Sequence, residues 1–199
     1  MRVRGPALAW LAAVLVAGCA AVPKHVFLTE EFAGPSTPYG RALERYTRKA
    51  ELYQGLDTVA KAWVTWRSPE LRKALVDTSA AYYRLGPEEA ERMRTEQDRV
   101  ARRVREFHLA LYTPAPGWND LESPDTLWRA VLVLPDGTRL EPVRVVHLAK
   151  TDKSAVEYPY VTPWTREYSL FFPLLEGRET YEHLTLILSG PLGEMRFAF

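Results

Sequence analysis

Four histidines, at positions 25, 108, 147 and 183, are the side chains able to act as acid, base or metal ligand near neutral pH. None pairs with another at the spacing by which a helix presents two metal ligands, and the HExxH, GxSxG and glycine-rich phosphate-loop patterns are missing. Carboxylates are frequent, but no two stand out as the acid pair of a glycosidase. We therefore expect no metal and no cofactor, and favour a non-enzymatic protein. A metal site built from different strands is the alternative for His108 and His147.

Aromatic residues concentrate in the segment 158–164, which reads Tyr-Pro-Tyr-Val-Thr-Pro-Trp. Its two prolines exclude a central strand and predict a loop or an edge segment. Rigid aromatic rings at a surface stack on sugars or anchor a protein partner, so Tyr158, Tyr160 and Trp164 form a candidate binding loop, with Trp118 from a second loop beside it. The pattern favours rings that fold inward and close one end of the core. We nevertheless expect at least one of the three to be exposed.

Charges are polarised along the segment 87–106. Acids stand at its start and arginines at its end, in the run Arg-Val-Ala-Arg-Arg-Val-Arg at 99–105. That order complements the helix dipole, which favours acids near the N-terminus and bases near the C-terminus. A solvated helix face is the interpretation we favour. The alternative is that the arginines grip phospholipid head groups or an anionic glycan.

The lone cysteine, Cys19, follows a charged start and a ten-residue apolar run at 7–16. Such a run is too short for a bilayer-spanning helix, which needs about 17–25 residues, and predicts a secretory signal peptide at 1–18. The sequence Val-Ala-Gly-Cys at 16–19 resembles the lipobox of bacterial lipoproteins. In that family the thiol receives a diacylglyceryl group and the peptide is cut just before it. The alternative is a free cysteine in an ordinary signal peptide or an uncleaved anchor.

The lipoprotein resemblance implies lipidation at Cys19, which makes membrane lipid the expected partner. It also implies a location in the bacterial cell envelope, and Ala20 in place of Asp favours the outer membrane facing the periplasm. The charge balance, 26 Lys and Arg against 25 Asp and Glu, argues against nucleic acid as a partner. A single cysteine also excludes an internal disulfide framework.

The mature chain divides into three predicted regions. Residues 19–39 are rich in proline, lack periodicity and are expected to form a lipidated tether. Residues 40–106 carry apolar side chains at helical spacing. Prolines at 69 and 87 mark helix starts, and Ser68 can cap the first of them. We predict helices over 40–66 (with a bend at Gly55), 69–85 and 87–106.

Beyond residue 106 the apolar pattern changes to period two, which is typical of strands. Strands are expected near 107–112, 128–134, 143–147, 168–172, 184–188 and 195–199. The fold class is therefore α+β, with N-terminal helices packed on a C-terminal antiparallel β-sandwich at 107–199. An immunoglobulin-like sandwich is one arrangement that these strands allow. If the halves pack as one unit, Trp63, Trp66, Tyr82 and Val104 should be mostly buried.

Three further pieces resemble uncharacterised bacterial envelope lipoproteins: Trp-Arg-Ser-Pro-Glu at 66–70, Leu-Ala-Leu-Tyr-Thr-Pro at 109–114, and the Tyr-Pro-Tyr loop. This resemblance implies no activity. The expected function is that of a lipid-anchored binding or assembly component at the periplasmic membrane face, with an envelope protein or glycan as partner. The alternative is an envelope hydrolase or glycan-binding module that acts on peptidoglycan or polysaccharide.

Overall fold

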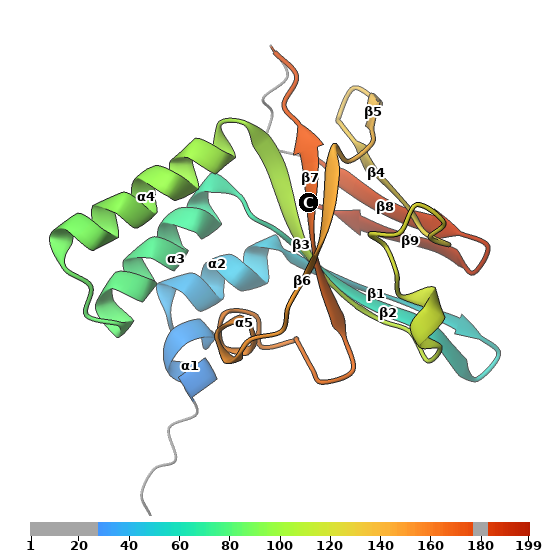
Figure 1. The fold of residues 1–199 in the computed structure, drawn as a ribbon, viewed down its shortest axis with the longest axis horizontal. Coiled ribbons are helices and arrows are strands. Elements are labelled where there is room, and N and C mark those ends of the chain that lie inside the picture. Colours follow the sequence, from blue (N-terminus) through green and yellow to red (C-terminus); the bar gives the residue numbers. More distant parts are fainter. Residues whose placement is uncertain (1–27, 177–182) are drawn as a thin grey trace, which may run out of the picture.

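The computed structural model describes residues 28–176 and 183–199 (Figure 1). Cys19, the predicted signal peptide and His25 lie outside the described residues. The described chain contains helices and two antiparallel sheets, which confirms the α+β class. In Figure 1 the helices lie on the left, the strands β3, β6 and β7 in the middle, and β4, β8 and β9 on the right.

Helix starts follow the predicted signals. Ser68 caps a helix through a 3.1 Å bond from the Leu71 amide to its Oγ, and prolines occupy the first positions of several helices. The helices are α1 (Leu28–Ala33), α2 (Pro38–Tyr46), α3 (Pro69–Tyr82), α4 (Pro87–Ala101) and α5 (Asp152–Glu157), with a 3₁₀ turn at Pro116–Trp118.

The strands form two sheets, of order β1-β2-β3-β7-β6 and β5-β4-β8-β9, and all neighbours are antiparallel. The strands are β1 (Thr47–Gln54), β2 (Asp57–Trp66), β3 (Val104–Tyr112), β4 (Arg129–Val133), β5 (Arg139–Leu140), β6 (Arg144–Leu148), β7 (Arg166–Pro173), β8 (Thr185–Gly190) and β9 (Gly193–Ala198).

The helix expected over 40–66 is wrong beyond Tyr46. Residues 47–66 form the β1–β2 hairpin, which turns at Gly55 with φ of +62°. Only glycine adopts that backbone region readily, so Gly55 makes a tight turn instead of a helix bend. Strands therefore lie within the region predicted as helical, and the third predicted helix ends at Ala101 because β3 begins at Val104. The boundary placed between residues 106 and 107 falls inside β3.

The tether expected over 19–39 does not extend through its described part. Residues 28–33 form α1, and the side chains of Phe32 and Tyr39 are fully buried. Their rings meet edge to face at 5.4 Å in a cluster shared with α3. Apolar burial of two aromatic rings outweighs the loop tendency of the surrounding prolines.

The return strand after the turn at 135–137 also differs from the expectation. The part of the return segment that pairs with β4 is only the short strand β5, over two residue pairs, and Pro142 then lacks an amide to continue the ladder. The chain moves to the other sheet, where the Val143 amide donates to the Phe171 carbonyl and β6 pairs with β7.

One apolar cluster joins side chains from both sheets, including Val64, Phe107, Leu132, Leu170 and Leu186. The prediction of burial is confirmed for Trp66, at 3% exposure. Trp63, Tyr82 and Val104 are half-buried instead. Each of these three lies at the margin of a packed layer.

Candidate functional site

Polar side chains cross the face of the five-stranded sheet that is turned away from the shared apolar core. Register places Thr47 opposite Thr65, Thr65 opposite His108, His108 opposite Ser169, and Ser169 opposite Val146. Thr65, His108 and Ser169 are all buried. Buried polar groups need hydrogen-bond partners, so this row identifies the part of the molecule where polar contacts are concentrated.

Glu106, a buried carboxylate two residues before His108 on the same face of β3, binds two arginines. Its oxygens lie 2.6 Å from Arg72 Nη2 and 3.0 Å from Arg67 Nη1, and the Ser169 hydroxyl donates to it at 2.9 Å. Burial alone would raise the pKa of Glu106, but the positive charges of Arg67 and Arg72 overcome it and hold that pKa below its usual value. Glu106 is therefore ionised and connects α3 to β3.

His108 lies between a carboxylate and a phenol. Its Nε2 is 3.0 Å from Glu167 Oε2, its Nδ1 is 3.0 Å from the Tyr160 hydroxyl, and its ring stacks on Tyr158 with centroids 3.8 Å apart. Burial lowers the pKa of His108, against the opposite influence of Glu167, so the ring is neutral at neutral pH. The neutral ring carries its proton on Nε2, which faces the carboxylate, and accepts from Tyr160 at Nδ1.

The hydrogen bonds continue as a chain of hydroxyls. The Thr65 hydroxyl lies 2.6 Å from that of Tyr160 and 2.6 Å from that of Thr47. Because Tyr160 donates to His108, it accepts from Thr65, which in turn accepts from Thr47. Burial raises the pKa of Tyr160 well above its usual value and keeps the phenol protonated. At the other end the Ser154 hydroxyl lies 3.0 Å from Glu167 Oε1.

This buried chain can hold parts of the fold together, but it does not present a reactive group to a substrate. His108 and Glu167 are 2% and 0% exposed. A cleft of about 530 Å³ reaches Tyr160 and Thr47, yet the phenol hydroxyl is turned inward to its two partners. The network therefore attaches the helical layer and the 158–164 loop to the sheet.

The candidate binding loop divides into two inward rings and one outward ring. Tyr158 is 4% exposed and Tyr160 is half-buried, so the favoured interpretation, that the rings fold inward, holds for these two. Trp164 is 78% exposed, which confirms that at least one ring lies at the surface. Trp118 is half-buried in the 3₁₀ turn, and no ring contact joins it to Trp164 within the described residues.

Hydrogen bonds hold the backbone on both sides of Trp164. The Thr162 amide donates to the Thr165 hydroxyl at 3.0 Å, and that hydroxyl donates back to the Thr162 carbonyl. Lys150 Nζ donates to the carbonyls of Thr162 and Pro163 at 3.1 and 2.6 Å. The exposed indole is thus presented by a loop with a defined shape.

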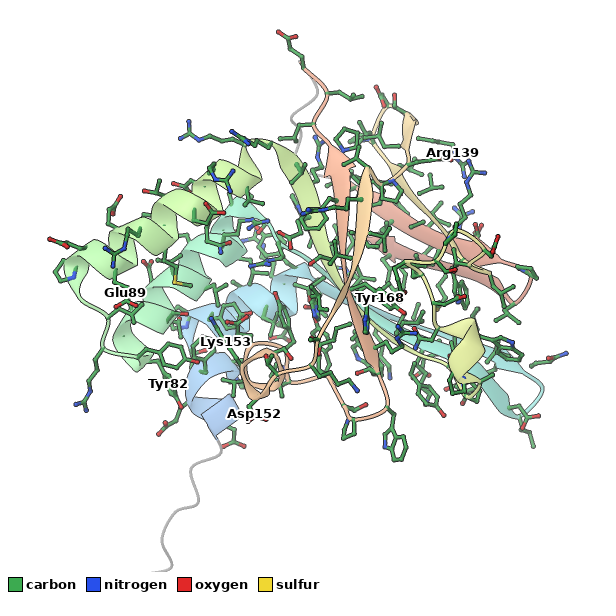
Figure 2. The ribbon with its side chains drawn as sticks, in the orientation of Figure 1. Tyr82, Glu89, Arg139, Asp152, Lys153 and Tyr168 are labelled. Atoms are coloured by element: carbon green, nitrogen blue, oxygen red, sulfur yellow. The ribbon has the colours of Figure 1, made fainter. Side chains whose placement is uncertain are left out.

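A second cleft, of about 510 Å³, adjoins this loop. Polar side chains of Lys150, Asp152, Ser154 and Thr162 contribute to its lining. Asp152 is labelled on α5 in Figure 2, below the helical layer. It is the one carboxylate that the described residues contribute to this cleft.

Within the described residues, no cluster of three or more histidine, cysteine, aspartate or glutamate side chains could hold a metal ion. His147 is exposed, and its Nε2 lies 3.4 Å from Arg166 Nε. In the same described part, none of the helices has the length and apolar character needed to cross a membrane.

Comparisons with protein families, with curated proteins and with solved structures find no match to this chain. The resemblance to envelope lipoproteins therefore stays a prediction.

Sequence reasoning missed the network of Glu106, His108 and Glu167. A signal for it exists, because Glu106 and His108 stand two apart within an apolar strand and hence share one face. Their partners Arg72 and Glu167 lie 34 and 59 residues away, and no local pattern links them.

Proposed function

We propose that this protein is a lipid-anchored component of the bacterial cell envelope, held at the membrane through Cys19, and that it binds an envelope partner through the surface around Trp164. The lipobox resemblance supports the anchor, the outer membrane facing the periplasm and the loss of residues 1–18. A non-enzymatic role agrees with the burial of His108 and Glu167, which keeps this histidine–carboxylate pair from contact with a substrate.

The observation that carries the binding proposal is the exposure of Trp164 on a loop whose backbone is held by hydrogen bonds. A large ring left 78% exposed buries much apolar area when a partner covers it. Because the loop is already ordered by hydrogen bonds, little conformational entropy is lost on binding. An envelope protein is the partner we favour.

The second candidate is a glycan-binding module. The 510 Å³ cleft beside the loop supports it, since hydroxyl, ammonium and carboxylate groups next to an aromatic ring suit a sugar. A glycosidase has less support, because its mechanism needs two carboxyl groups and this lining offers only Asp152 among the described residues.

The test compares Trp164→Ala with Leu56→Ala. Leu56 is 100% exposed at the tip of the β1–β2 hairpin and serves as a matched control for loss of an exposed apolar side chain. A photo-crosslinking residue at the exposed position 163, next to Trp164, or at the exposed position 57, next to Leu56, first identifies the partner in intact cells. Trp164→Ala should then weaken capture of that partner about tenfold or more and leave the melting temperature nearly unchanged, whereas Leu56→Ala should change neither.

Two outcomes would contradict this proposal. A drop of many degrees in the melting temperature of Trp164→Ala would show that the ring is structural. Equal capture by both variants would place the binding surface elsewhere. Sedimentation with purified peptidoglycan, lost only in Trp164→Ala, would favour the glycan candidate over the protein partner.

The finer architecture belongs to the same proposal. We expect the two sheets to form the predicted β-sandwich with the helices packed on its outside. The shared apolar cluster and the packing of β1 against β9 support this arrangement.

A further inference from the structure

Three arginines from two distant segments line one cleft. Arg99 lies in the last turn of α4, Arg103 lies in the short turn between α4 and β3, and Arg144 comes from the edge strand β6. In Figure 1 the chain passes from the upper end of α4 directly into β3. The cleft measures about 520 Å³, within the roughly 300–1,000 Å³ typical of small-molecule sites.

The described residues neutralise only part of the positive charge of this cleft. Arg99 binds both oxygens of Glu96, at 2.7 and 2.8 Å, so that carboxylate is already used. Arg103 influences Glu96 at longer range, but neither Arg103 nor Arg144 forms an ion pair with any described residue. Among the described residues, none that lines the cleft is a carboxylate.

Apolar side chains complete the lining. Phe171 and Val143 lie beside Arg144, with two valines of 100–104 on the opposite wall. The Arg144 guanidinium stacks over the Phe171 ring at 4.3 Å from its centroid, which holds the charge in one place. Val143 is 64% exposed at the rim, although apolar side chains gain by burial.

Attraction to the C-terminal end of the helix dipole accounts for the arginines in and just after the last turn of α4, but not for Arg144. That residue belongs to another segment, and its approach to Arg103 brings like charges into one cleft at an electrostatic cost. A bound anion would remove this cost, and an apolar group next to the anion would cover Val143 and Phe171.

We propose that this cleft binds an anionic amphiphile, in which a phosphate head is joined to a short apolar body, as at the head-group end of an anionic lipid. The head would lie between Arg103 and Arg144, and the apolar body would lie against Val143 and Phe171. This proposal depends neither on the anchor at Cys19 nor on the partner of Trp164.

The test uses the full chain, purified in a nonionic detergent, and isothermal titration calorimetry with hexyl phosphate. Inorganic phosphate supplies the head alone and should bind at least tenfold more weakly. Hexyltrimethylammonium, of opposite charge, should not bind. Dihexanoylphosphatidylglycerol should bind at least as well as hexyl phosphate if the natural source is a lipid, whereas a free phosphomonoester as the source predicts the reverse order.

Arg103→Gln and Arg144→Gln should each lower the affinity for hexyl phosphate about tenfold or more, because each removes a charge-assisted contact. Arg102→Gln is the matched control. Arg102 is exposed beside Arg103 but does not line the cleft, so its replacement should change the affinity by less than about twofold. Val143→Asp should abolish binding without unfolding the chain, because that side chain is exposed.

The proposal is overturned if inorganic phosphate binds as tightly as hexyl phosphate, since the apolar walls would then have no role. It is also overturned if Val143→Asp binds like the unaltered chain, or if Arg102→Gln loses as much affinity as Arg103→Gln. The Val143→Asp result decides the matter even if Arg144→Gln fails to fold.

Discussion

At the scale of single residues, Tyr160 illustrates how the network is built. Its hydroxyl lies between the buried Thr65 hydroxyl and Nδ1 of His108, at 2.6 and 3.0 Å. Loss of this one oxygen would leave Nδ1 without a donor in a place that water does not reach. An unsatisfied buried polar group costs about 1–3 kcal/mol.

We therefore expect Tyr160→Phe to lower the free energy of unfolding by about 1–3 kcal/mol, as measured by the shift of the urea midpoint at constant m-value. Tyr53→Phe removes the same oxygen from an exposed tyrosine bonded to Glu51 and should have almost no effect. Equal destabilisation by the two variants would show that the buried chain of hydroxyls adds nothing beyond a surface hydrogen bond.

The 158–164 segment also shows what a sequence can say about individual residues. Its prolines correctly indicate a loop, and its composition indicates rings that pack or bind. Which ring turns inward depends on Thr65 and His108, which lie 95 and 52 residues from Tyr160. Local spacing carries no information about such partners, so the outward position of Trp164 could not be assigned in advance.

At the scale of elements, a buried ion pair between Arg72 and Glu106 attaches α3 to the sheet. Arg72 is 3% exposed, and its guanidinium donates to Glu106 of β3 at 2.6 Å and to the side-chain oxygen Oε1 of Gln97 in α4 at 2.6 Å. One side chain thus joins two helices to a central strand. Removal of Arg72 would leave the buried Glu106 carboxylate with one compensating arginine, Arg67, in place of two.

Arg72→Met keeps much of the side-chain volume and should lower the free energy of unfolding by up to about 3–5 kcal/mol in denaturant titrations, the upper end applying if Arg67 compensates Glu106 poorly. Arg94→Met is the control, because Arg94 forms exposed ion pairs with Glu91 and Asp77, and exposed pairs contribute little. If Arg72→Met were as stable as Arg94→Met, the attachment of α3 would depend on apolar packing alone.

Elements with capping signals were predictable, and the β1–β2 hairpin was not. Ser68 and Pro69 mark the start of α3 because a cap and a fixed φ act locally. Residues 47–66 carry apolar side chains that satisfy a helical spacing, but Ala60, Ala62, Val64 and Trp66 also alternate with period two. Pairing with β3 decides between these patterns, because it buries that alternate face in the shared core.

At the scale of the whole molecule, β3 lies between β2 and β7 in the five-stranded sheet. The strand joins the part of the chain predicted to be helical to the part predicted to be a sandwich, so the two cannot separate without breaking a central ladder. Composition and periodicity indicated both kinds of structure, but not their interleaving. Long-range strand order leaves no local signature in the chain.

Attachment of this molecule to a membrane that survives a high-salt wash should depend on Cys19 alone. A diacylglyceryl group supplies two long chains, and each buried CH₂ contributes about 0.8 kcal/mol, whereas one acyl chain gives only marginal binding. Cys19→Ser should therefore block lipidation and signal-peptide removal.

A chain joined at Ala20 to a different secretory signal should appear in the soluble periplasmic fraction after a high-salt wash. High salt screens any contact between lipid head groups and the cleft arginines Arg99, Arg103 and Arg144. The chain with its native leader should remain in the membrane pellet under the same wash. Recovery of the Ala20 fusion in that pellet would mean that a surface of the folded part holds the membrane, and the single-anchor proposal would have to be abandoned.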